Sequence, residues 1–258
     1  MTNLSVNVNK IAWLRNAREG SRPNLVELSQ IIIKSGANGI TVHPRPDLRH
    51  IRPQDVYDLR TLTKANNVEF NIEGNPFSQP TKAYPGFMEL IRELKPEQCT
   101  FVPDDDHQIT SDHGWNLLNK NNKLRDYINV ASELGVRVSL FMDPENIQIE
   151  KAKEISADRV ELYTGPYADS FYDKDQRNAN LIKYSEASLF AKSLGLDVNA
   201  GHDLDQENLK NFLINVEVDE VSIGQALISD ALLDGLETTI NNYLLICNGK
   251  SKTPLIAE

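Results

Sequence analysis

Apolar residues follow two alternating patterns along the chain. Short runs rich in valine, isoleucine and phenylalanine alternate with longer stretches in which apolar residues recur every three or four positions. The short runs have the length and composition of buried strands, and the longer stretches have the period of amphipathic helices. The short runs predict eight strands: Leu4–Val8, Gly39–His43, Val68–Gly74, Gln98–Pro103, Val136–Asp143, Arg159–Gly165, Asp197–His202 and Glu220–Gly224.

Glycine and proline mark the ends of the predicted helices. Gly36, Gly135 and Gly195 each follow a helical stretch and lead within a few residues into a predicted strand. Pro53 and Pro144 stand where helices are expected to begin, because proline fits the first helical turn and glycine the residue after the last one. The chain is therefore predicted to repeat a strand–helix unit.

Eight such units in 258 residues predict an α/β fold, a single (β/α)8 TIM barrel with extra helical elements. An open, doubly wound sheet is the alternative. Polar residues at the carboxyl ends of the strands favour the barrel, because only a barrel brings all these ends to one mouth. They are Asn7, His43, Glu73, Asp143, Thr164, His202 and Gly224. No linker rich in proline, glycine or serine divides the chain, so one domain is expected over residues 1–247, with a flexible tail over 248–258.

Composition narrows the class of protein. The 27 basic and 37 acidic residues give a net charge of −10, which argues against a nucleic-acid partner. No run of about 18 apolar residues occurs and no secretory leader is visible, so neither a membrane span nor secretion is expected. Cys99 and Cys247 have no metal-ligand or redox-motif spacing. A reducing, cytoplasmic setting is the expectation.

The charge is unevenly distributed. Between Lys10 and Arg52 stand eight basic and three acidic residues, a local net charge of +5. Arginine forks bind phosphate oxygens in pairs, so at least one of Arg18, Arg45 and Arg49 is expected to bind an anion. Other basic residues of this segment are expected to form surface ion pairs.

A second anion site is expected at the end of the predicted barrel. The last strand leads through Gly224 and Gln225 directly into a helix, and Gly201, His202 and Asp203 end the strand before it. In barrels, the loops after these two strands commonly bind phosphate through backbone N–H groups. Glycine favours any tight turn, so the motif alone is weak.

Three histidines and one glutamate are candidates for proton transfer: His43, His50, His202 and Glu73. A histidine at the mouth titrates near neutral pH and can both accept and donate a proton. If Phe70 and Ile72 face the helices, Glu73 faces into the barrel, where burial would raise its pKa. The residues alone leave two alternatives open: hydrogen-bonded structural histidines, or a metal site built from two histidines and one carboxylate.

Two connections are long enough to be lids over such a site. Residues 103–115 and 164–178 have no apolar period and are predicted to be irregular loops. A solvated connection is the alternative for each. Within the first loop, His107, His113 and the run Asp104–Asp106 are expected to be exposed to solvent.

Four segments together resemble the pyridoxine 5′-phosphate synthase family. The similarity follows the chain in order from the first strand to the last and covers nearly its whole length. The most specific segment is the second, with the pattern GITVHxRxDxRHI. The segments are Val6–Arg18, Gly39–Ile51, Asn71–Glu73 and Val198–His202.

The resemblance implies a reaction and a set of roles. Family members condense 3-amino-2-oxopropyl phosphate with 1-deoxy-D-xylulose 5-phosphate, releasing phosphate and water, without metal or organic cofactor, and they assemble as homo-octamers. The resemblance implies that His43 and Glu73 are proton acceptors and His202 is the proton donor. For 1-deoxy-D-xylulose 5-phosphate it implies contacts from Asn7, Asn9, Lys10, Arg45, His50 and Thr110. For the amino-ketone phosphate it implies contacts from Arg18, Asp203, Gly224 and Gln225.

Four positions, at three places in the chain, depart from the family pattern. Many members have Asp-His where this chain has Asn9 and Lys10, and Gly-His where it has Gly224 and Gln225. The glycine expected after the strand-seven histidine is Asp203, whose carboxylate would repel a phosphate dianion unless it turns away. These departures predict altered binding of the amino-ketone phosphate. A metal-dependent sugar-phosphate isomerase or epimerase on the same barrel, and a barrel that binds a phosphorylated ligand without turnover, are the alternative functions.

Overall fold

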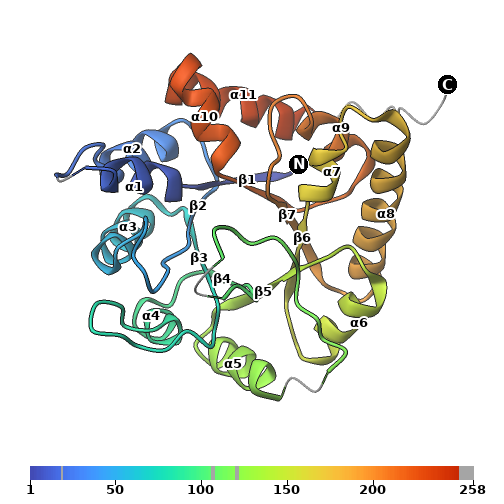
Figure 1. The fold of residues 1–258 in the computed structure, drawn as a ribbon, viewed down its shortest axis with the longest axis horizontal. Coiled ribbons are helices and arrows are strands. Elements are labelled where there is room, and N and C mark those ends of the chain that lie inside the picture. The colour runs from blue at the N-terminus through green and yellow to red at the C-terminus, as the bar shows by residue number, and fades with distance from the viewer. Residues whose placement is uncertain (19, 106–107, 120–121, 250–258) are drawn as a thin grey trace.

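The computed structural model describes residues 1–18, 20–105, 108–119 and 122–249. Its eight parallel strands close into a barrel in chain order, with β1 pairing with β8 (Figure 1). This confirms the predicted (β/α)8 barrel and excludes the open sheet. The strands are β1 (Asn3–Asn7), β2 (Gly39–Val42), β3 (Glu69–Gly74), β4 (Gln98–Phe101), β5 (Arg137–Met142), β6 (Arg159–Tyr163), β7 (Asp197–Gly201) and β8 (Glu220–Ile223).

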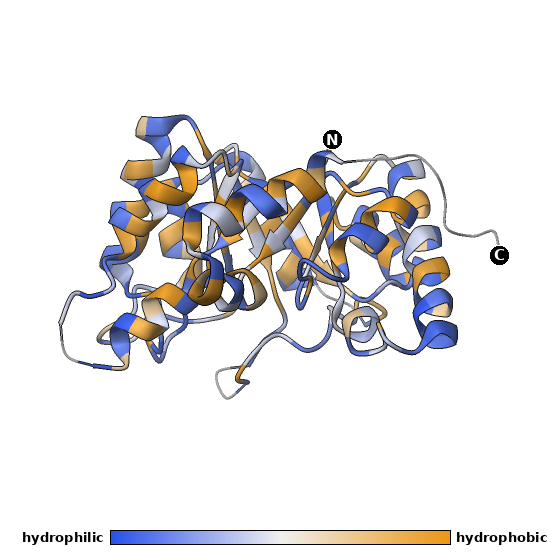
Figure 2. Cartoon of the chain, turned by 90° about the horizontal axis from the view of Figure 1, so that it is seen from above, coloured by the Kyte–Doolittle hydropathy of each residue, from blue (hydrophilic) through white to orange (hydrophobic). Residues whose placement is uncertain are grey.

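Helices surround the barrel. Pairs of helices follow β1, β6 and β8, which confirms the predicted extra elements. The helices are α1 (Asn9–Asn16), α2 (Leu25–Lys34), α3 (Pro53–Asn66), α4 (Phe87–Leu94), α5 (Asn122–Glu133), α6 (Asn146–Glu154), α7 (Gly165–Asp169), α8 (Lys174–Ser193), α9 (Leu209–Asn215), α10 (Gln225–Asp234) and α11 (Leu236–Asn248). Figure 2 shows hydrophobic and hydrophilic residues alternating along them, as expected of helices that cover a core on one side.

Side chains of β3 alternate between the helical layer and the barrel interior, as predicted. Phe70 and Ile72 belong to the fully buried apolar core. Asn71 Nδ2 donates to Thr41 Oγ1 on β2 (3.3 Å), and Asn71 Oδ1 accepts from Thr100 Oγ1 on β4 (3.2 Å). The barrel interior is therefore polar at this level. Glu73, two residues after Asn71, faces the same interior, nearer the mouth.

The predicted helix ends are confirmed where the backbone conformation is special. Gly36, Gly135 and Gly195 have φ angles of 104°, 77° and 71°, which side chains rarely adopt. α3 begins at Pro53, and α6 begins two residues after Pro144.

One predicted loop is wrong. Residues 164–178 are largely helical, because they contain α7 and the start of α8. Pro166 lies in the first turn of α7, and Asp173 caps α8 by accepting from the backbone N–H groups of Asp175 and Gln176. Residues 103–105 and 108–115, by contrast, contain no helix or strand, in agreement with the other predicted loop.

The C-terminal helix packs against the rest of the fold. In α11, Ile240, Tyr243 and Cys247 are buried. The tail expected from residue 248 lies, from residue 250 onward, outside the described residues. Among the helices of the described part, none has the length and apolarity that crossing a membrane requires.

Candidate active site

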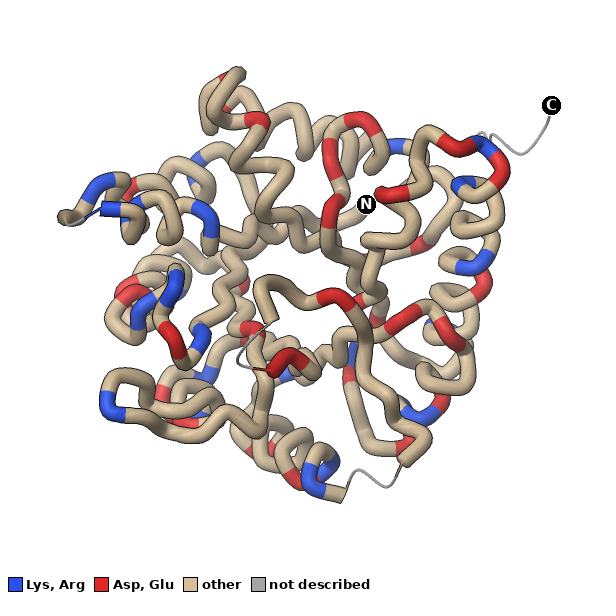
Figure 3. The backbone as a smooth tube through the Cα atoms, viewed as in Figure 1, with Lys and Arg blue, Asp and Glu red and all other residues tan. Residues whose placement is uncertain are grey.

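A cavity of about 340 Å³ opens at the carboxyl ends of the strands. It brings together almost all the residues singled out from the sequence: Asn7, Asn9, Lys10, His43, Arg45, His50, Glu73, Thr110, His202, Asp203, Gly224 and Gln225 line it. Many of the basic residues lie on the side of the barrel formed by α1, α2 and α3 (Figure 3). The residues of the predicted site therefore share one space.

Arg18 is the exception among the predicted contacts. It is exposed in the bend that follows α1 and is not among the residues lining the cavity.

Glu73 lies at the end of β3 and points into the barrel. Its Oε2 accepts a hydrogen bond from Asn7 Nδ2 (3.2 Å) and lies 3.9 Å from His43 Nδ1. Burial raises the pKa of Glu73 well above its ordinary value, the carboxylates of Glu161 and Asp104 raise it further, and Arg45 opposes them. A carboxyl group with a raised pKa beside a histidine can accept and return a proton.

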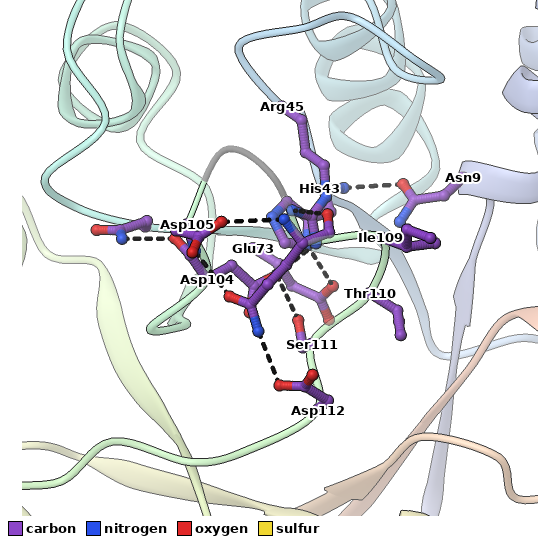
Figure 4. A network of polar contacts seen from close by, with 12 residues as sticks. Asn9, His43, Arg45, Glu73, Asp104, Asp105, Ile109, Thr110, Ser111 and Asp112 are labelled. Atoms are coloured by element: carbon purple, nitrogen blue, oxygen red, sulfur yellow. Dashed lines mark hydrogen bonds and ion pairs between the residues drawn. The ribbon is translucent and has the colours of Figure 1, made fainter.

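His43 is held as a neutral imidazole. Burial lowers its pKa well below the ordinary value, and the positive charge of Arg45 lowers it further. Its backbone N–H donates to Asn9 Oδ1 (2.9 Å), so the first residue of α1 fixes the end of β2 (Figure 4). A neutral ring near neutral pH is the form that can accept a proton.

His50 is also neutral, with a defined proton position. Burial, followed by the charges of Arg45 and Arg49, lowers its pKa to about 3. Its Nδ1 accepts a hydrogen bond from the backbone N–H of Ile51 (2.9 Å). The ring proton must therefore be on Nε2, where it can be donated to a ligand oxygen.

His202 is held from several sides. Its Nε2 lies 2.9 Å from Thr110 Oγ1, and its Nδ1 lies 3.0 Å from Asp203 Oδ2. The ring of Tyr163 packs edge-on against the imidazole, with centroids 5.3 Å apart. The ring of Phe141, which lines the cavity, has its centroid 6.3 Å from that of the imidazole.

Arg45 already has an acidic partner. It forms a buried ion pair with Asp104, whose Oδ2 also accepts from Ser111 Oγ (2.7 Å; Figure 4). The prediction that Asp104 is exposed to solvent is wrong, because a buried guanidinium needs a carboxylate beside it. Asp106 and His107 lie outside the described residues, whereas His113 is exposed as predicted.

Lys10 contributes a second cation to the cavity. Its Nζ lies over the ring of Trp13, 4.5 Å from the centroid. Burial lowers its pKa, and the charge of Asp203 opposes that shift.

Two buried glutamates, Glu161 and Glu220, were not predicted from the sequence. Glu161 lies on β6 in register with Asn199 on β7, which is in register with Glu220 on β8. Asn199 Nδ2 donates to Glu220 Oε1 (2.9 Å). Burial is the main reason that the pKa of Glu161 rises to about 8 and that of Glu220 to about 7. Glu161 lines the cavity, and the alternation along β6 could have identified it, as it did Glu73 on β3.

The spacing of the titratable side chains bears on the metal alternative. Within the part of the chain that the structure describes, no three histidine, cysteine, aspartate or glutamate side chains are grouped as a metal ion requires.

The closed barrel and the titratable side chains gathered at its mouth are those of a (β/α)8-barrel enzyme. The chain belongs to the family described as Pyridoxal phosphate biosynthesis protein PdxJ, which matches residues 4–249. This confirms the family that the four sequence segments indicated.

Named relatives cover almost the whole chain. It is 52% identical over 253 residues to the pyridoxine 5′-phosphate synthase of Xanthomonas campestris pv. campestris (strain B100), with 98% of both chains covered. It is 51% identical over 244 residues to the protein of the same name from Xylella fastidiosa (strain M12), with 94% of both chains covered.

Solved structures with low sequence identity share the fold. The thiamine phosphate pyrophosphorylase of Pyrococcus furiosus matches with a TM-score of 0.62 at 12% identity, covering 96% of both chains. A tryptophan synthase structure from Mycobacterium tuberculosis matches with a TM-score of 0.64 at 13% identity, covering 96% of this chain and 92% of that one. These matches support the barrel and carry no information about the reaction.

Proposed function

We propose that this chain condenses 3-amino-2-oxopropyl phosphate with 1-deoxy-D-xylulose 5-phosphate, closing the pyridoxine ring and releasing phosphate and water. One observation carries the proposal: a member of this family gathers Glu73, His43 and His202 around one cavity that also holds Arg45 and Lys10. Two phosphorylated substrates require cations, and ring closure with loss of water requires several proton transfers.

In this proposal, 1-deoxy-D-xylulose 5-phosphate binds on the side of β1 and β2. Lys10 and Arg45 supply positive charge there, and the Nε2–H of His50 supplies a neutral donor. The remaining contacts proposed on this side are Asn7, Asn9 and Thr110. The buried pair with Asp104 keeps Arg45 oriented before the phosphate arrives.

The amino-ketone phosphate binds, in this proposal, on the side of β7 and β8. Gly224 is the residue before the first turn of α10, and Gln225 begins that helix. Backbone N–H groups at a helix start suit a phosphate group. The backbone of Asp203 borders the same side, and Arg18 is proposed to reach the site of a neighbouring subunit.

The three titratable groups divide the proton transfers in this proposal. His43 and Glu73 accept protons, since burial keeps the imidazole neutral and the raised pKa of the carboxyl group makes its carboxylate a stronger base. His202 donates a proton to the hydroxyl oxygen that leaves as water when its bond to carbon breaks.

Incubation of the purified protein with both substrates, with and without EDTA, tests the proposal by the absorbance of pyridoxine 5′-phosphate. Product should form equally in both. His202→Ala and Glu73→Gln should each lower kcat by about 100-fold or more. His113→Ala, which alters an exposed histidine, is the control and should leave the rate unchanged. Binding of the substrates without product would overturn the proposal, and loss of product in EDTA would favour a metal-dependent reaction.

We also propose a homo-octamer in the cytoplasm. Leu232 and Leu233 at the end of α10 and Leu245 on α11 are highly exposed apolar side chains, as expected of surfaces that meet other subunits. The free, buried thiols of Cys99 and Cys247 suit a reducing compartment. Analytical ultracentrifugation tests the assembly: a monomer at micromolar concentration would contradict it.

A further inference from the structure

We propose that the side chain of Asp203 is a positioning residue for His202, and that it holds the ring proton on Nδ1 so that Nε2 faces the substrate. This inference rests on the proposed role of His202 as proton donor. It reassigns the Asp203 carboxylate, which the sequence placed in the binding site for the amino-ketone phosphate.

The two hydrogen bonds of the imidazole are on opposite nitrogens. Asp203 Oδ2 lies 3.0 Å from Nδ1, and Thr110 Oγ1 lies 2.9 Å from Nε2. A histidine held by a carboxylate on one nitrogen, with the other aimed into a cavity, is the arrangement that orients a catalytic acid or base.

The charge state of Asp203 fixes the direction of the first bond. The hydrogen bond from His202 is the main reason that the pKa of Asp203 is lowered, and the charge of Lys10 lowers it further. An ionised carboxylate can only accept, so Nδ1 must carry the proton. Nε2 then accepts from the Thr110 hydroxyl when the ring is neutral, and carries the transferable proton when the ring is charged.

The turn that carries both residues is fixed by its neighbours. His202 and Asp203 have φ angles of 92° and 57°. The Thr164 hydroxyl donates to the backbone oxygens of Gly201 (2.7 Å) and His202, and Asn208 Nδ2 donates to the Asp203 oxygen (3.0 Å). Aspartate tolerates a φ near 57° better than most residues. A carboxylate can therefore stand where the family pattern has glycine without altering the turn.

Two aromatic side chains also pack near the His202 ring. The centroid of Tyr163 lies 5.3 Å and that of Phe141 6.3 Å from the centroid of His202. The Asp203 carboxylate is directed toward the imidazole. The hydrogen bond from His202 and the positive charge of Lys10 stabilise its negative charge. This explains how a carboxylate can lie in a cavity proposed to bind phosphate groups.

The proposal predicts a specific split in the kinetics of Asp203→Asn and Asp203→Gly. Both should lower kcat about tenfold or more, because the His202 ring loses the hydrogen bond that orients it. The KM for the amino-ketone phosphate should change less than about threefold. If Asp203 instead acted by repelling the phosphate, these variants would lower that KM and leave kcat unchanged, which would overturn the proposal. Asp58→Asn, an exposed charge change on α3, is the control for net charge.

The ring tautomer gives a readout independent of turnover. In protein with 15N-labelled histidine, the Nδ1 and Nε2 chemical shifts of neutral His202 should show the Nδ1–H form, and Asp203→Asn should shift the ring toward the Nε2–H form. An unchanged tautomer in this variant would overturn the proposal. If the wild-type protein made no product, the proposed function would fail, whereas the tautomer would still decide whether Asp203 positions His202.

Discussion

The guanidinium of Arg45 and the carboxylate of Asp104 form a buried ion pair that joins the end of β2 to the loop crossing the cavity. Arg49 strengthens the same junction, because its Nη1 donates to the backbone oxygen of Gln108 (2.8 Å). The first segment of the loop is thus held down by two arginines. Opening it requires separation of a pair that water does not screen.

Asp104→Ala is expected to release this loop. Breaking a buried pair costs about 3–5 kcal/mol, and loss of even half of that would speed loop opening more than tenfold. The measurement is the rate of limited proteolysis within residues 103–115. Asp112→Ala removes an exposed carboxylate from the same loop, which pairs with His113, and should change the rate little. Equal rates in the two variants would contradict the assigned role of the buried pair.

His50 is expected to bind 1-deoxy-D-xylulose 5-phosphate as a neutral donor at every working pH. With a pKa of about 3, its ring stays uncharged from pH 5 to pH 9. Its NMR signals should therefore not titrate in that range. His50→Ala should raise the Kd for this substrate about tenfold, the worth of one buried hydrogen bond. A titration of His50 between pH 5 and pH 9 would show that the ring binds as a cation.

Glu161 is expected to make the fold less stable as pH rises. Its pKa is about 8 in the folded protein, above the ordinary value of 4.5, so the folded state binds its proton more tightly than the unfolded state does. Its contribution to stability is complete below about pH 4.5 and is lost as pH rises through about 8.

Glu161→Gln should remove that dependence. At pH 9 the variant should melt at least about 2 °C above the wild type, and at pH 4.5 the two should melt together, as measured by calorimetry. Glu154→Gln, on the exposed end of α6, is the control and should follow the wild type at both pH values. A variant less stable than the wild type at pH 9 would refute the assigned linkage.

Gly114 is expected to tolerate no side chain. A Cβ atom there would lie 2.2 Å from the Asp143 backbone nitrogen. The N–H of Gly114 donates to Asp143 Oδ2 (3.1 Å), and that of Trp115 to the Phe141 oxygen (2.9 Å). Gly114→Ala should displace this end of the loop and weaken binding of 1-deoxy-D-xylulose 5-phosphate about tenfold, measured by calorimetric titration. His113→Ala, one residue away and exposed, should bind normally.

The barrel is predictable from the sequence because its signals are local. Apolar period, strand alternation and glycine at helix ends are properties of neighbouring residues, and the alternation along β3 is enough to place Glu73 in the interior. The helix at 165–169 is missed because its five residues are too few to show an apolar period. The start of the helix at 174–193 is missed because polar residues dominate its first turns. The signals present there are Pro166 and the capping residue Asp173.

The electrostatic partners are not predictable from one sequence. Asp104 is separated from Arg45 by 59 positions, and nothing in the acidic run around it distinguishes the residue that is buried. The pairing of Asp203 with His202 is between neighbours, yet it depends on the positive φ angles of both residues, which the sequence does not reveal. Charge alone suggests repulsion of a phosphate group, whereas the turn directs the carboxylate to the imidazole.

The interior carboxylates should respond differently to selection for stability and to selection for activity. Glu73, Glu161 and Glu220 each have a raised pKa inside the barrel. A neutral replacement at these positions should therefore stabilise the fold, because no buried carboxyl group has to ionise there. A library of variants sorted only for heat resistance should become enriched in glutamine at these three positions. The same library sorted for growth without vitamin B6 should retain glutamate wherever the reaction needs it. Comparing the two populations would separate carboxylates that serve the chemistry from those that merely occupy the barrel.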